Sequence, residues 1–218
     1  EGSDLKKVIA IDGPAASGKS TAARYVAESL NFVHVNSGLV FRAITWWAIR
    51  EGLDEVTEIF SDALRDLKID LQRSAGGLTV VVEGVSPGRA LHGPAVTDYV
   101  PAISSVPKVR SVVLDRLRNA AARFDLVCDG RDIGTTVFAG ADLKVYLIAD
   151  VSERARRRIL EGKRRVTEEI VTQEEARLAA RDLADTSRTL SPLRKAEDAI
   201  EVDTTRMSLE EVVNVILS

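Results

Sequence analysis

The chain has 218 residues, of which 45% are hydrophobic and 29% charged, and its formal net charge at pH 7 is -3. This length suits one domain with an insertion, or one domain and a small second one, and the apolar content is sufficient for a full core. The near balance of charges excludes the strongly basic surface of a nucleic-acid-binding protein, and the single cysteine, Cys128, excludes a disulfide framework. No segment is long and apolar enough to span a bilayer. We therefore expect a cytoplasmic monomer that binds neither nucleic acid nor a membrane.

Strand-like and helix-like segments alternate along the chain. Short apolar runs predict strands at residues 8–11, 126–128, 144–148 and 199–202. Apolar residues at helical spacing predict helices at residues 21–30, 38–50, 108–123, 153–160 and 173–185. This alternation is typical of a parallel sheet covered by helices on both faces, so the predicted fold class is α/β.

One segment departs from the α/β pattern. Residues 67–72 alternate between apolar and polar side chains, residues 74–77 have turn composition, and residues 78–82 resume strand-like chemistry. We interpret this segment as a small antiparallel hairpin inserted into the α/β core. The expected core covers residues 7–62 and 94–218, and the expected insert covers residues 63–93.

Two capping boxes predict where helices begin. Thr172-Gln-Glu-Glu175 is expected to open the helix that carries Arg181, and Ser208-Leu-Glu-Glu211 is expected to open the last helix.

Residues 13–20 match the phosphate-binding pattern G-x-x-x-x-G-K-[ST]. The motif follows a predicted strand and precedes a predicted helix, which is the context in which backbone N–H groups surround phosphate oxygens. Lys19 would reach the outer phosphates of a nucleoside triphosphate, and the hydroxyl of Ser20 would bind Mg²⁺. The residues expected to bind the nucleotide are Gly13, Pro14, Ala15, Ala16, Ser17, Gly18, Lys19, Ser20 and Thr21.

Many arginines lie where a second phosphorylated molecule could bind. The motifs of a GTPase switch are missing, because residues 129–132 do not supply D-x-x-G in its usual context and nothing resembles N-K-x-D. Phosphoryl transfer between two polyanions depends on positioning and charge neutralisation, which guanidinium groups provide. The arginines concerned are Arg42, Arg110, Arg131, Arg181 and Arg188, with a cluster at Arg154, Arg156, Arg157 and Arg158.

The order of these motifs resembles that of the bacterial cytidylate kinases. The resemblance runs from about residue 7 to the C-terminus, and it rests on residues 13–21, 36–42, 109–110, 129–135, 181–193 and 198–205. It implies the fold of the P-loop nucleoside monophosphate kinases, with a helical lid near residues 153–172 that closes over ATP. In this family the hairpin corresponds to an enlarged insert that binds the nucleoside monophosphate.

The resemblance implies roles in binding the acceptor CMP. Ser37, Arg42 and Arg131 match residues that hold its monophosphate, and Arg110 and Asp132 match residues that recognise its base. A guanidinium facing the acceptor atoms of cytosine, with a carboxylate accepting from the exocyclic amine, is the complementary pattern. Uracil has a carbonyl in place of that amine, so a carboxylate at position 132 would disfavour UMP.

The remaining roles concern the ribose, the metal and the transferred group. Arg181 and Asp185 match ribose-binding residues, and Asp129 matches the carboxylate that assists Ser20 at Mg²⁺. The catalytic residues implied by the resemblance are Lys19, Arg131, Arg188 and Arg157.

Several positions depart from the usual family pattern, and Ala139-Gly140 replaces a usual Pro-Asp. Asn36 stands where Asp is usual, Phe41 where Tyr is usual, and Pro101 where a base-contacting Ser is usual. Proline lacks both a hydroxyl and a backbone N–H, so the change at position 101 bears on base specificity.

The sequence therefore predicts an enzyme that transfers the γ-phosphoryl group of Mg·ATP directly to CMP or dCMP. Two alternatives remain at this point. The acceptor could be another monophosphate, such as UMP or AMP, or the protein could be a nucleotide-binding regulator without kinase turnover.

Overall fold

The computed structural model describes residues 6–53, 58–75 and 77–218. Within these ranges they form two compact units, of which the first contains residues 6–7 and 33–126 and the second contains residues 8–32 and 127–218. Across the described ranges, none of the helices has the length and apolar character that crossing a membrane requires.

The second unit is built on parallel strands. The strand order is β5-β1-β6-β7, and β1 pairs in parallel with β6, which pairs in parallel with β7. All five residues of β1 and of β5 are buried, because helices cover a parallel sheet on both faces and its central strands must be apolar throughout. The bounds are β1 Val8–Asp12, β5 Leu126–Gly130, β6 Leu143–Ile148 and β7 Ile200–Asp203.

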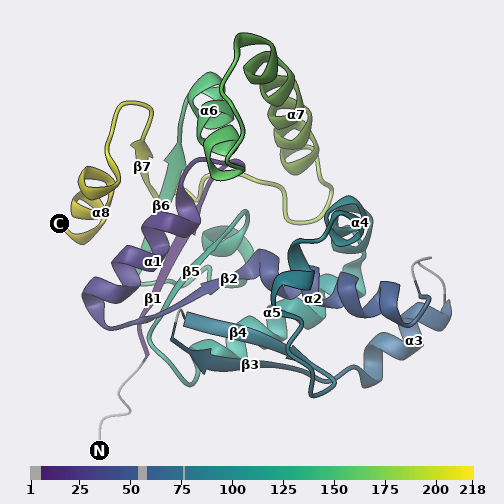
Figure 1. Ribbon diagram of the computed structural model, residues 1–218. Helices are drawn as coiled ribbons and strands as arrows, with labels where there is room; N and C mark the ends of the chain where they lie inside the picture. The colour runs from purple at the N-terminus through teal and green to yellow at the C-terminus, as the bar shows by residue number, and fades with distance from the viewer. Residues whose placement is uncertain (1–5, 54–57, 76) are drawn as a thin grey trace, which may run out of the picture. The chain divides into compact units, whose positions relative to one another are not determined.

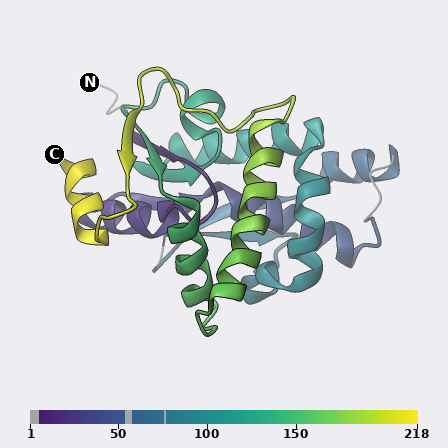
Figure 2. The ribbon, with the colours of Figure 1, turned by 90° about the horizontal axis from the view of Figure 1, so that it is seen from above.

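Helices cover this sheet and extend beyond it. α1 lies beside α8, and their apolar faces share a core cluster with Ile11, Val127 and Leu147 of the strands (Figures 1 and 2). α6 leaves the end of β6, and α7 returns beside it, with Ala155 and Leu178 in a second buried cluster. The bounds are α1 Lys19–Leu30, the π-helical turn η2 Ile133–Val137, α6 Val151–Glu161, α7 Glu168–Thr186 and α8 Leu209–Leu217.

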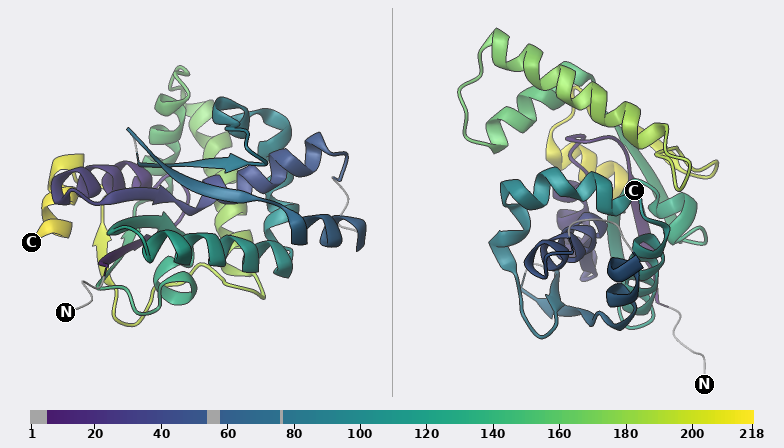
Figure 3. Two further views of the ribbon diagram at one scale, coloured as in Figure 1. Left: turned by 90° about the horizontal axis from the view of Figure 1, so that it is seen from below. Right: turned by 90° about the vertical axis from the view of Figure 1, so that its right-hand side faces the viewer.

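The first unit contains the predicted hairpin. β3 and β4 pair antiparallel, and the inward side chains of the pair, such as Leu71 and Val80, are buried. β4 lies beside α2 and β3 beside α5 (Figure 3). Gly77 has a φ of +119°, and a Cβ there would lie 2.5 Å from the carbonyl oxygen of His34, so only glycine fits. The bounds are β2 Val33–Asn36, α2 Ser37–Arg50, α3 Glu58–Asp66, β3 Ile69–Ser74, β4 Gly77–Val82, the 3₁₀ turn η1 Gly88–His92, α4 Pro94–Ser104 and α5 Pro107–Ala121.

The predicted fold class is confirmed, as are all four predicted strands, all five predicted helices and the hairpin. The hairpin's predicted turn includes residue 76, which lies outside the described residues. The sequence did not predict β2, α3, η1, α4 or η2. β2 has four residues, and α4 contains Pro101, so neither carries a regular periodic signal. That residues 63–93 act as a separate monophosphate-binding insert stays a prediction.

One of the two predicted capping boxes is wrong. α7 begins at Glu168, five residues or one and a half turns before the predicted start, and the side chain of its N-cap Thr167 accepts from the N–H of Ile170. Thr172 therefore lies inside the helix, where its hydroxyl donates to the carbonyl of Glu168. The second box is confirmed, with Ser208 and Glu211 capping α8 reciprocally.

The two threonines of α7 should respond oppositely to alanine. Thr167→Ala removes an N-cap acceptor and should lower the free energy of unfolding by about 1 kcal/mol. Thr172→Ala is the matched control in an exposed interior position, where alanine should leave that free energy unchanged or raise it by about 0.3 kcal/mol. Urea denaturation followed by circular dichroism measures both, and a larger loss for Thr172→Ala would contradict the observed helix start.

Candidate active site

The loop between β1 and α1 has a backbone shaped for anions. Gly13 has a φ of +147°, and a Cβ there would lie 2.1 Å from the carbonyl oxygen of Leu147, so the loop passes close against β6. Ala16 and Gly18 also have positive φ values, which turn successive N–H groups. The N-cap Gly18 has no side chain to cap α1, so the first amides of that helix can serve a phosphate.

Lys19 is the buried cation of this loop. Its side chain is 5% exposed, and Nζ donates to the carbonyl of Pro14 and, over 3.3 Å, to Ser17 Oγ. Burial lowers the pKa of Lys19 well below its usual range, and nearby Arg131 adds to this effect, whereas Asp129, Asp12 and Asp185 oppose it. Lys19 therefore has charged neighbours of both signs, and a bound polyanion would favour its charged form.

Ser20 and Asp129 bring two oxygens together beside the loop. Ser20 Oγ donates to Asp129 Oδ2 over 2.6 Å, and Asp129 is 1% exposed at the end of β5. Within the described ranges there is no group of three or more His, Cys, Asp or Glu side chains that could hold a metal. One hydroxyl and one carboxylate fit a hard cation that takes its other ligands from phosphates and water, as Mg²⁺ does.

A charged cluster joins Arg131, which follows β5, to the end of α7. Arg131 Nε donates to Asp185 Oδ2 over 2.8 Å, and Arg188 donates to the other oxygen of the same carboxylate. Asp185 is 2% exposed, whereas the two arginine side chains keep 20% and 28% of their surface exposed. Two cations share one anion, so this cluster has excess positive charge and exposed guanidinium surface with which to meet an anion.

Arg188 lies just beyond the end of α7. The helix ends at Thr186, with Ser187 as its C-cap, so Arg188 lies in the following segment. It still meets Asp185 because the chain turns back at the helix end. Arg181 lies on α7 itself, one turn before Asp185, as predicted.

The first unit holds the other residues expected to bind the acceptor. Ser37 is buried at the first position of α2, and Arg42 on the same helix donates to the carbonyl of Leu91 over 2.9 Å and to Thr97 Oγ1 over 3.0 Å. Arg42 is therefore held between α2 and the segment from η1 to α4.

The structure shows the surroundings of two residues that depart from the family pattern, Phe41 and Pro101. The guanidinium of Arg110 lies 5.5 Å from the centroid of the Phe41 ring, so the phenylalanine offers its face to this cation. Pro101 lies inside α4, exposed, and its carbonyl accepts from Ser104 Oγ over 3.2 Å.

Two arginines of α6, Arg157 and Arg154, make different contacts within the second unit. Arg157 donates to Glu153, to Thr204 Oγ1 over 3.0 Å and to the Thr204 carbonyl over 2.6 Å. A Cβ on Gly18 would lie 3.9 Å from Arg157 Nη1, so this guanidinium is beside the phosphate-binding loop. Arg154 is buried instead, and it ties the carbonyl of Ala15 to Asp182 of α7.

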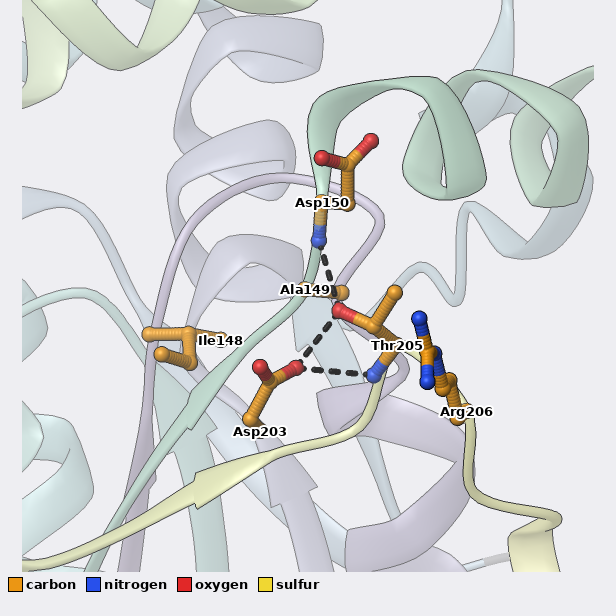
Figure 4. Close-up of a pocket in the computed structure, with 6 residues that line it drawn as sticks. All are labelled: Ile148, Ala149, Asp150, Asp203, Thr205 and Arg206. Atoms are coloured by element: carbon orange, nitrogen blue, oxygen red, sulfur yellow. Dashed lines mark hydrogen bonds between the residues drawn. The ribbon is translucent and has the colours of Figure 1, made fainter.

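A cavity of about 670 Å³ opens at the carboxyl ends of β6 and β7 (Figure 4). Asp203 accepts from the N–H and the hydroxyl of Thr205, which hold the pKa of Asp203 below its usual range, and Thr205 Oγ1 accepts from the N–H of Asp150. Neighbouring Thr204 donates to the carbonyl of Ile148 over 3.1 Å and reaches that of Ser17 over 3.4 Å, so the cavity adjoins the phosphate-binding loop. The lining residues are Ile148, Ala149, Asp150, Asp203, Thr205 and Arg206.

The sequence analysis assigned no role to the residues of this cavity. The available signal was their position, because ligands of open α/β sheets bind beyond the carboxyl ends of the strands.

Comparisons with known proteins identify the family of the chain. The family model described as "Cytidylate kinase" matches residues 9–218. The chain belongs to the cytidylate kinase family. It is 39% identical over 216 residues to a cytidylate kinase of Bacillus cytotoxicus, with 99% of this chain and 96% of the relative covered. It is 43% identical over 210 residues to a cytidylate kinase of Geobacillus kaustophilus, with 96% and 94% covered.

The resemblance inferred from the motifs is thus confirmed. Among solved structures, a shikimate kinase from Acinetobacter baumannii in complex with shikimate aligns with 98% of this chain and 92% of its own, at 19% identity and a TM-score of 0.48. That likeness is too distant for a conclusion about function.

Arg154 and Arg158 of α6 should differ sharply in their contribution to stability. Arg154→Met should lower the free energy of unfolding by about 3 kcal/mol, because it removes one partner of a largely buried ion pair and two hydrogen bonds to carbonyls. Arg158→Met is the matched control, since its exposed pair with Glu161 should contribute less than about 0.5 kcal/mol. Urea denaturation compares them, and equal losses would refute the structural role of Arg154.

Proposed function

We propose that the protein transfers the γ-phosphoryl group of Mg·ATP to CMP and dCMP, yielding ADP and the corresponding diphosphates. The observation that carries this proposal is the group of charges around Lys19 in the second unit, which joins the phosphate-binding loop to the pair of arginines on Asp185. Membership of the cytidylate kinase family supports the choice of acceptor. We also propose that the protein works as a monomer in the cytoplasm.

The donor nucleotide would bind along the phosphate-binding loop. The amides of the loop and of the α1 N-terminus would contact the phosphates, and Lys19 would reach the outer ones. The cavity beside Thr205 is within the usual size range for small-molecule sites and adjoins the loop through Thr204, so we assign the nucleoside of ATP to it. Arg157 of α6, whose guanidinium lies beside Gly18, would also contact the donor phosphates.

Ser20 and Asp129 would hold Mg²⁺, Ser20 through its hydroxyl and Asp129 through water. When Mg²⁺ is bound, it would neutralise part of the negative charge on the donor phosphates. The hydrogen bond between these two side chains supports the assignment, because it brings both oxygens to one place beside the loop.

Eight residues are assigned to the acceptor. In the second unit, Arg131 and Arg188 would hold its phosphate, Asp132 would accept from the cytosine amine, and Arg181 with Asp185 would contact the ribose. In the first unit, Ser37, Arg42 and Arg110 are assigned to the monophosphate and the base. The support in the structure is the excess positive charge and the remaining exposure of Arg131 and Arg188.

The chemistry requires no covalent intermediate. An oxygen of the acceptor's phosphate attacks the γ-phosphorus, and the bond from that phosphorus to the bridging oxygen of ADP breaks, so the leaving group carries away the electron pair. The attacking phosphate oxygen is already deprotonated at neutral pH, which makes a general base unnecessary. The work of Lys19, Arg131, Arg157 and Arg188 is orientation and stabilisation of charge on the transferred group.

A panel of acceptors tests the proposed function. ADP release from Mg·ATP should be stimulated by CMP and dCMP, and kcat/KM for UMP should be lower by at least about tenfold because Asp132 faces a carbonyl in uracil. Equal stimulation by UMP or AMP would overturn the cytosine specificity. Release that no monophosphate stimulates would overturn the kinase assignment and favour a regulatory nucleotide-binding role.

Arg131 should affect turnover more than ATP binding. Arg131→Ala should lower kcat by at least about 100-fold, the usual effect of losing a group that stabilises transition-state charge, while KM for ATP changes by less than about threefold. Arg123→Ala, which removes an exposed arginine of the first unit, is the control and should leave both constants unchanged. Steady-state kinetics with CMP and ATP varied separately measures the two effects, and an unchanged kcat for Arg131→Ala would exclude the catalytic role.

A further inference from the structure

Asp12, the last residue of β1, has a carboxylate that none of the roles above uses. It is 4% exposed and immediately precedes Gly13 of the phosphate-binding loop. Its two oxygens accept from two consecutive backbone amides, Oδ1 from Ile133 over 2.9 Å and Oδ2 from Gly134 over 2.7 Å. Such a bidentate contact fixes the direction of the peptide groups that it binds.

The two amides are those that a helical turn leaves without partners. Ile133 and Gly134 are the first residues of the π-helical turn η2, and its N-cap, Asp132, makes no side-chain capping bond. Asp12 therefore caps the turn from a neighbouring strand, with the negative charge that the N-terminus of a helix favours. The carbonyl of Asp132 accepts from Thr136 and Val137, which fixes the other side of the same turn.

Packing leaves this turn little room to move. A Cβ on Gly134 would lie 3.4 Å from Asp12 Oδ2 and 3.2 Å from Cδ of Lys144, so the backbone fits between these two side chains. Lys144 is itself held by Asp198, to which Nζ donates over 2.8 and 2.9 Å. The residues just before the turn, Arg131 and Asp132, are those assigned to the acceptor.

We propose that Asp12 is a positioning residue, which anchors the acceptor-binding segment Arg131–Asp132 to the start of the phosphate-binding loop. The inference rests on the proposed function for what Arg131 and Asp132 bind, but the anchoring itself is a property of the chain. The carboxylate of Asp12 would thus keep a constant distance between the phosphate-binding loop, which binds the donor, and the segment that binds the acceptor. Direct in-line transfer requires such a fixed distance.

Asp12 is also poised to change protonation near neutral pH. Burial raises its pKa from 3.8 to about 6, and Asp132 adds to this, whereas the two amides and Lys19 act in the opposite direction. A protonated carboxyl has one oxygen that bears hydrogen, so it accepts less well from two amides. The titratable or charged side chains that face Asp12 or the turn it caps are Lys19 of α1, Cys128 of β5, Asp132 of the following segment, and Lys144 and Tyr146 of β6.

Asp12→Asn tests the anchoring, with Asp142→Asn as the matched control. Asparagine keeps the size of the side chain but offers one acceptor and one donor to the two amides. Asp142 also accepts from a backbone amide, that of Val8 at the other end of β1, over 2.9 Å. Both variants therefore weaken a carboxylate–amide contact, and in Asp12→Asn the weakened contact is with the turn that directly follows Arg131–Asp132.

Kinetics should separate the two variants. We expect Asp12→Asn to lower kcat/KM for CMP by about tenfold or more while KM for ATP changes less than about twofold. Asp142→Asn should leave kcat/KM for CMP within about twofold of the wild type. Equal effects on both substrates in Asp12→Asn, or an equal loss in the control, would overturn the proposal.

The dependence on pH supplies a second readout. The ratio of kcat/KM for CMP between wild type and Asp12→Asn should fall toward one as the pH is lowered from 7.5 to 5.5, since protonated Asp12 resembles asparagine. Titration of the phosphate of CMP affects both enzymes alike and cancels in the ratio. A ratio that does not vary with pH would contradict a role for the charged carboxylate.

Amide hydrogen exchange keeps the test independent of the proposed function. Protection of Ile133 and Gly134 should fall by about tenfold in Asp12→Asn, and unchanged protection would overturn the anchoring even if no monophosphate stimulates ADP release. Reduced protection in a protein without kinase turnover would instead leave the anchoring intact and refute only the function. If Asp12→Asn does not fold, the wild type can be measured alone, with exchange corrected for its intrinsic dependence on pH. Protection of Ile133 and Gly134 should then be lower at pH 5.5 than at pH 7.5, while protection in β6 stays the same. Equal protection of these two amides at both pH values would refute the proposal.

Discussion

The concentration of buried charge at the carboxyl ends of the parallel strands is the constraint on which the second unit depends. Asp12, Lys19, Asp129 and Asp132 are each less than 10% exposed, although ionised side chains are rarely buried unless they are paired or hydrogen-bonded. The carboxylate of Asp12 accepts from two backbone amides, and that of Asp129 accepts from the hydroxyl of Ser20. Hydrogen bonds of this kind offset the cost of burying a carboxylate.

The cationic side of that balance is distributed over several elements. Lys19 comes from α1, Arg131 from the segment after β5, Arg157 from α6 and Arg188 from the segment after α7. Each is held by hydrogen bonds to carbonyl oxygens or carboxylates, so little side-chain entropy remains to be lost when phosphates bind. Arg131 and Arg188 share a single carboxylate, that of Asp185, which leaves an excess of positive charge at this cluster.

Neighbouring turns of α6 carry two arginines with different surroundings. Arg154 is buried and binds the phosphate-binding loop to α7, whereas Arg157, three residues later, contacts the end of β7 beside Gly18. Composition alone cannot separate such residues, since both are arginines of one helix. Their roles follow from which face of α6 packs against the rest of the unit.

The sequence by itself determined the class of fold, the phosphate-binding loop and the family. Hydrophobic periodicity and the Gly-Lys-Ser pattern are local signals, so residues 8–30 revealed strand, loop and helix without any knowledge of long-range contacts. Only the tertiary structure decided which charges meet. The start of α7 at Glu168, the reach of Arg188 back to Asp185 beyond the helix end, and the capping of Ile133 and Gly134 by Asp12 depend on where distant segments pack. The two amides that Asp12 binds lie 121 and 122 positions further along the chain. Packing rather than local propensity brings such distant residues together, so their contacts leave no periodic pattern in the sequence.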